Sequence, residues 1–61
     1  MAAGIILEIS RVGNSQKVTA VDEETGVEVS FIAPVSAPRM DIERLARSKI
    51  AYVLRKKSAE S

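Results

Sequence analysis

The chain has 61 residues, with nine Lys or Arg against eight Asp or Glu and a formal charge of +1 at pH 7. It contains no Cys and no His, which excludes a disulfide framework, a thiol nucleophile, and the side chain that most often serves as general base or metal ligand. A chain this short forms one domain at most, because it buries only about 60% of the surface that its unfolded form exposes. We therefore expect a single small domain over residues 1–61, without a cofactor and without a bound metal.

Hydrophobic residues make up 46% of the chain, and their periodic arrangement is typical of a folded domain rather than a disordered segment. The apolar stretch at residues 1–7 is too short for a secretion signal, and no basic segment precedes it. No run approaches the roughly 18 apolar residues that a membrane span needs. These features predict a cytoplasmic protein with no membrane partner.

Three segments alternate between apolar and polar residues, as half-buried strands do: 5–12, 16–22 and 27–33. Gly13-Asn14 lies between the first two and suits a two-residue hairpin loop of type II′ or type I′. A polar loop that ends at Gly26 separates the second segment from the third. Pro34 ends the third strand, because proline cannot donate a hydrogen bond to a neighbouring strand.

The two loops predict the register of each hairpin separately. Both registers place the same apolar residues on one face of the sheet: Ile5, Leu7, Ile9, Val18, Ala20, Val27, Val29 and Phe31. A slip of one residue in either hairpin would destroy this agreement, because side chains alternate between the two faces of a strand. The pattern therefore predicts an antiparallel meander with one apolar face.

Residues 38–57 show the period of an amphipathic helix. At about 100° per residue, one side of this helix collects an apolar stripe: Ile42, Leu45, Ala46, Ile50 and Val53. We expect Ser36 to cap the start of the helix and Pro38 to occupy its first turn. Residues 58–61 are expected to form a polar tail.

An apolar sheet face and an apolar helix stripe are buried when they pack against each other. The predicted fold class is therefore α+β, a three-stranded antiparallel β-meander followed by one C-terminal α-helix packed on one sheet face (β-β-β-α). The predicted core consists of Leu7, Ile9, Val18, Val29, Phe31, Leu45 and Val53. Lys49 falls within the helix stripe, where we expect its methylenes to be buried and its ammonium group to reach the edge.

Candidate catalytic groups are sparse. The serines have no His to act as a base, and no spacing pairs a serine with Lys17 or Lys49. The acidic residues 22–24 fall in the second predicted loop, where a solvated turn is the expected role and a weak cation site is the alternative. The three glycines are too scattered for a phosphate-binding loop. The sequence therefore predicts that the protein is not an enzyme.

Charge is divided unevenly along the chain, with a net −3 over residues 1–38 and a net +4 over residues 39–61. A basic helix face can bind an acidic partner or the phosphates of a nucleic acid. The candidate residues for this face are Arg44, Arg47, Arg55, Lys56 and Lys57. The alternative is an ordinary solvated helix face, which the small net charge of the chain favours.

The sheet face turned away from the helix has apolar residues of its own. The register places Ile6 opposite Val21, and Ile32 lies on the same face. One helix cannot cover this face as well, and small chains with a one-sided sheet often associate through such a face or through a sheet edge. The predicted self-association face is therefore Ile6, Val21 and Ile32.

The sequence RVGNS at 11–15 is followed by KVTAVD at 17–22, then by TG at 25–26, EVS at 28–30 and a helical segment at 49–57. These stretches resemble a group of small uncharacterised bacterial proteins. The resemblance covers most of the chain and implies a stand-alone protein. The group has no assigned activity, so the resemblance transfers no functional residue.

Together these features predict a small non-enzymatic protein-interaction module that self-associates. Its expected partner is a second copy of itself or an unknown protein. The alternative is a weak nucleic-acid-binding accessory protein that uses the basic face of the C-terminal helix.

Overall fold

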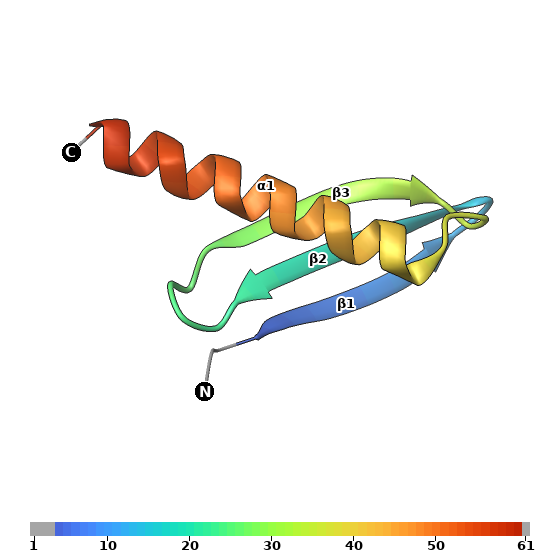
Figure 1. Cartoon of the computed structure of the whole chain (residues 1–61). Coiled ribbons are helices and arrows are strands. Elements are labelled where there is room, and N and C mark those ends of the chain that lie inside the picture. Colours follow the sequence, from blue (N-terminus) through green and yellow to red (C-terminus); the bar gives the residue numbers. More distant parts are fainter. Residues whose placement is uncertain (1–3, 61) are drawn as a thin grey trace.

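The structure, a computed structural model, describes residues 4–60 and contains one sheet and one helix (Figure 1). Its elements are β1 (Ile5–Val12), β2 (Ser15–Asp22), β3 (Glu28–Pro34) and α1 (Arg39–Glu60). The strands are antiparallel in the order β1-β2-β3, and α1 packs on one face of the sheet. The predicted β-β-β-α architecture is confirmed.

Both predicted registers are also confirmed. Ala20 lies opposite Leu7 on one side and opposite Val29 on the other. Val18 likewise lies between Ile9 and Phe31. The apolar residues of all three strands therefore share the face on which α1 packs.

The first hairpin turns at Gly13, which has a φ of 61°. Within residues 4–60 no residue other than glycine has a positive φ, so the φ of Asn14 is negative. A positive φ at the first central residue alone defines a type II′ turn, whereas type I′ needs a positive φ at both. The structure therefore selects the type II′ turn from the two that the sequence allowed.

The second hairpin closes through Asp22. Its backbone N–H donates to the carbonyl oxygen of Val27 at 2.8 Å, and its carbonyl oxygen accepts from the N–H of Gly26 at 2.8 Å. Its carboxylate accepts a hydrogen bond from the Thr25 hydroxyl at 2.6 Å. Gly26 has a φ of 77°, which only glycine adopts without strain. The acidic loop thus has a structural role, since one of its carboxylates holds the turn.

The helix starts and ends later than the sequence predicted. The carbonyl oxygen of Pro38 accepts the first helical hydrogen bond, from the N–H of Ile42 at 3.1 Å, so Pro38 and not Ser36 occupies the cap position. A residue before proline is disfavoured in the helical conformation, which prevents an earlier start at Ala37. At the other end, α1 continues to Glu60 rather than ending at residue 57, because no glycine or proline follows Lys57 to stop it.

The core is made largely of small side chains. Two connected clusters lie between α1 and the sheet, and their buried members are Val18, Ala20, Val27, Ala33, Ile42, Ala46 and Ile50. Alanine at three of these positions brings the helix close to β2 and β3, the strands that it contacts. Leu7 and Phe31 are half-buried and pack against both clusters.

Two predicted core residues are wrong. Ile9 is 37% exposed, because α1 packs over β2 and β3 and leaves this part of β1 at the margin. Leu45 is 42% exposed, because it lies on the flank of α1 beside β3, where no further described strand extends the sheet. Both errors follow from the lateral position of the helix.

The first prediction concerns Phe31. Because its ring joins both core clusters, Phe31→Ala should lower the free energy of unfolding by about 3 kcal/mol, a large part of the stability of so small a domain. Urea denaturation followed by circular dichroism measures this loss. An unchanged midpoint would show that the core does not depend on Phe31.

The second prediction concerns the close approach of the helix. Ala46 is fully buried, so Ala46→Leu should push α1 off the sheet and lower the free energy of unfolding by about 1–3 kcal/mol. Ala51 is exposed on the same helix, and Ala51→Leu should change the free energy by less than about 0.5 kcal/mol. Equal effects of the two substitutions in thermal melts would contradict the assigned helix face.

Candidate functional site

The open face of the sheet, turned away from α1, holds the predicted self-association residues. Ile6 and Val21 are directly paired across β1 and β2, with Ile6 half exposed. Ile32 is 64% exposed but pairs with Lys17, which is four residues from Val21 along β2. At about 3.3 Å per residue, this offset separates Ile32 from Val21 by roughly 13 Å along the sheet.

A polar row lies between these two apolar spots. The hydroxyl groups of Thr19 and Ser30 are 3.2 Å apart and share a hydrogen bond, and Glu8 lies beside Thr19 in the same row. The structure therefore brings Ile6 and Val21 together but places Ile32 apart from them. Self-association through this face stays a prediction, now with two small patches in place of one.

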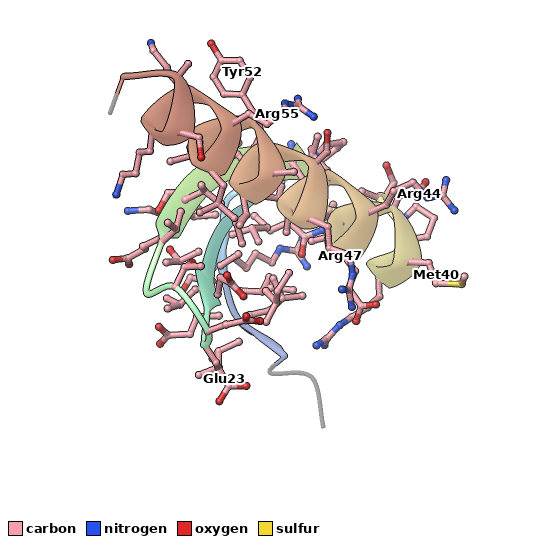
Figure 2. All side chains as sticks on the ribbon, turned by 60° about the vertical axis from the view of Figure 1, so that its left-hand side comes forward. Glu23, Met40, Arg44, Arg47, Tyr52 and Arg55 are labelled. Carbon is pink, nitrogen blue, oxygen red and sulfur yellow. The ribbon has the colours of Figure 1, made fainter. Side chains whose placement is uncertain are left out.

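The predicted basic residues divide into three arginines that share one side of α1 and two lysines that do not. Figure 2 shows Arg55 and Tyr52 on one side of α1 and Arg47 on the side toward β1. Arg47 lines a small cavity with residues of β1, whereas Arg44 lies beside Asp41 and Leu45 on the other flank. All five predicted cations are exposed. At 100° per residue, Arg44 and Arg55 lie about 20° apart on the side of α1 opposite its buried residues, and Arg47 lies about 60° from Arg44, toward β1. Lys56 and Lys57 point to other sides of the helix, so only the three arginines share a solvent face.

The flank of α1 beside β1 is covered by long charged side chains. A cavity of about 60 Å³ lies there, lined by Ile5, Leu7, Arg39, Glu43 and Arg47. Arg39 Nε and Glu43 Oε1 are 3.5 Å apart and form an ion pair between residues one helical turn apart. The alkyl stems of such residues cover apolar surface while their charged ends stay in water. Little apolar surface of Ile5 and Leu7 is therefore available to a partner.

The flank of α1 beside β3 is different. An open groove of about 540 Å³ runs between the strand and the helix, and we call it the β3–α1 groove: Val29, Ser30, Leu45, Ser48, Lys49, Tyr52 and Val53. Tyr52 is 58% exposed at its rim, and Leu45 is also exposed. The sequence interpretation missed this groove, although Leu45 and Tyr52, seven residues apart, share one side of the helix.

Lys49 is one of the residues that line the groove. Its Nζ lies 5.6 Å from the centroid of the Phe31 ring, within the range of a cation–π contact. The residue is exposed, and its Nζ lies over the ring of the half-buried Phe31. The cation thus covers part of the Phe31 ring, while burial of the Lys49 methylenes stays a prediction.

The strand beside the groove has an unpaired edge. Asp22 and Val27 form a hydrogen-bonded pair, and such pairs recur at every second residue of an antiparallel ladder. Val29 and Phe31 therefore direct their backbone groups toward β2. The residues between them direct their backbone N–H and carbonyl groups away from β2, and no described strand forms hydrogen bonds with these groups. These residues are Glu28, Ser30 and Ile32.

The β3–α1 groove and the free edge of β3 meet at Ser30, which lines the groove and belongs to the edge strand. A strand that paired with β3 would gain backbone hydrogen bonds along the edge. Its side chains on the helix side would enter the groove, because alternate side chains of a strand face the same side. This arrangement suits recognition of an extended segment or of another sheet edge.

Residues 4–60 contain neither a cluster of metal ligands nor a membrane-spanning helix. Among residues 4–60, no group of three or more His, Cys, Asp or Glu side chains is arranged to hold a metal ion. Over the same residues, no helical segment combines the length and the hydropathy that crossing a lipid bilayer requires.

Comparison with known proteins identifies a family but no activity. The sequence model of the family described as Domain of unknown function (DUF6898) matches residues 2–57. No curated protein and no solved structure matches the chain.

Proposed function

We propose that this chain, which belongs to the family described as Domain of unknown function (DUF6898), is a small non-enzymatic protein-interaction module that self-associates. The observation that supports the proposal is that the accessible surface is larger than that of a compact monomer of the same mass. The accessible surface is 4532 Å² for a mass of 6.6 kDa. A compact monomer of this mass exposes about 3,900 Å².

This excess of roughly 600 Å² is comparable to the area that one partner buries in a stable interface, about 800 Å². The shape of the molecule accounts for it. The principal extents are 39 × 27 × 15 Å, and the radius of gyration is 12.4 Å, against about 10.5 Å for a compact chain of this length. One helix on a three-stranded sheet leaves the other sheet face and the β3–α1 groove uncovered. A second copy would cover such surface.

We propose a cytoplasmic location for this module. The absence of Cys is compatible with a reducing compartment.

The third prediction is the oligomeric state. Sedimentation equilibrium of the purified chain from low to high micromolar concentration should give a mass near twice 6.6 kDa at the upper end. The apparent mass should fall on dilution, because a partner interface of this size need not be permanent. A monomer throughout this range would remove the self-association proposal.

Weak nucleic-acid binding is the second candidate function, and one observation favours it. Within the described part of the chain, Arg44, Arg47 and Arg55 are exposed and form no ion pair with a carboxylate. They are available to phosphates, with Arg44 and Arg55 on one side of α1 and Arg47 about 60° from Arg44, but no aromatic side chain accompanies all three. The arrangement supports only nonspecific contacts.

The fourth prediction tests this candidate. Binding of duplex or single-stranded oligonucleotides should be no tighter than about micromolar at low salt and should fall steeply as salt rises, because each phosphate contact releases a counterion. Replacing Arg44, Arg47 and Arg55 with Gln should abolish it and leave the circular dichroism spectrum unchanged. If the wild type gives no anisotropy signal at high micromolar protein, nucleic acid is not a partner.

A further inference from the structure

We infer that the chain forms its self-contact along the free edge of β3 and not through the open sheet face, with a two-fold axis at Ser30 that pairs β3 with β3 of a second copy in antiparallel orientation. This inference rests on the proposed self-association and assigns it a surface. Two sheets would join into one sheet of six strands, and both helices would lie on the same face.

The backbone of β3 selects the register. Centred on Ser30, the pairing places Glu28 opposite Ile32 of the second copy, so all three outward-facing residues exchange both of their backbone hydrogen bonds. A shift toward the end of the strand would place Glu28 opposite Pro34, which has no N–H to donate. The register centred on Ser30 therefore pairs every outward backbone group of these three residues, whereas the shifted register leaves the carbonyl of Glu28 without a donor.

The side chains match in the same register. On the helix side, Val29 lies opposite Phe31 of the second copy and Val27 opposite Ala33, so each pair is apolar. An aromatic residue opposite a β-branched residue is a favourable cross-strand pair. On the open face, Ser30 meets Ser30 and Glu28 meets Ile32, so no like charges are directly opposed. The side chains of β3 in one copy are thus compatible with those of β3 in the other.

The helix flank agrees with this arrangement. The two-fold axis runs beside the β3–α1 groove of each copy, so the exposed Leu45 and Tyr52 of one helix face the same flank of the other. Asp41 precedes them and Lys56 follows them on that flank, as 100° per residue requires. Because the two helices are antiparallel, Asp41 of one helix lies on the side of Lys56 of the other, which is electrostatically favourable.

The edge of β1 is a poorer candidate. The cavity on that side is about 60 Å³, against about 540 Å³ for the β3–α1 groove. Arg39, Glu43 and Arg47 overhang it, and charged side chains beside a strand edge oppose pairing with another edge. A partner at β1 would have to displace these side chains, whereas the apolar rim of the β3–α1 groove is already exposed.

A cross-link at the two-fold axis tests the register directly. The Cα atoms of a hydrogen-bonded antiparallel pair are about 5.5 Å apart, within the roughly 4.4–6.8 Å that a disulfide spans. The chain has no Cys, so Ser30→Cys introduces a single thiol. Mild oxidation of this variant should give a covalent dimer in high yield. Ser10→Cys, on β1 of the same open face, is the matched control and should stay monomeric on denaturing gels.

A proline at the same position tests the backbone contact. The N–H of Ser30 points away from β2, so Ser30→Pro removes no backbone hydrogen bond within the monomer and loses only the hydroxyl contact with Thr19, but it removes one donor from each copy at the proposed seam. The dimer should dissociate at least about tenfold more readily. Ser30→Ala loses the hydroxyl contact with Thr19 but keeps the N–H, and it should keep the wild-type dimer. Circular dichroism confirms the fold of each variant.

The outcomes separate this inference from the proposed function. A wild-type chain that is monomeric overturns both. A wild-type dimer that shows no cross-link through Ser30→Cys, or that persists unchanged in a folded Ser30→Pro variant, overturns the β3 contact and leaves self-association standing. Replacing Ile6 and Val21 with Lys should leave the dimer intact. Loss of the dimer in that folded variant would place the contact on the open face and overturn the β3 assignment.

Discussion

Buried alanines at two places between the sheet and the helix determine where everything else in this molecule lies. Ala20 and Ala46 belong to one buried cluster and Ala33 to the other, and their small side chains let α1 approach β2 and β3 closely. A close approach at these two places fixes the helix off the centre of the sheet. The margin of β1 and the groove beside β3 are both consequences, because one helix cannot cover three strands from that position.

The off-centre helix makes the two edges of the sheet chemically different. Charged side chains of the helix overhang β1, and exposed apolar side chains overlook β3. Both strands have unpaired backbone groups, so hydrogen bonding alone does not distinguish them. The two edges differ in the free energy of removing the neighbouring side chains from water. This free energy is unfavourable for an arginine and favourable for a leucine.

The fold could be predicted from the sequence because two hairpins independently set the partners of the same strand, β2. Ala20 and Val18 belong to both hairpins, so two independent loops had to agree on their partners, and they did. The burial of Ile9 and Leu45 could not be predicted in this way, since both depend on how far the helix is displaced sideways. The β3–α1 groove was missed for the same reason. The start of the helix was misplaced because Ser36 is a good cap by residue type, while Pro38 controls the backbone.

The ion pair of Arg39 with Glu43 has a consequence for stoichiometry. A protein whose sheet could be extended at both edges would add copies without limit and grow into a filament. In the proposed dimer, these charges and Arg47 shield β1, and the two-fold contact occupies the edge of β3. Assembly would then terminate at two chains. The charged residues beside β1 would therefore act less as a source of stability than as a stop against fibrous growth.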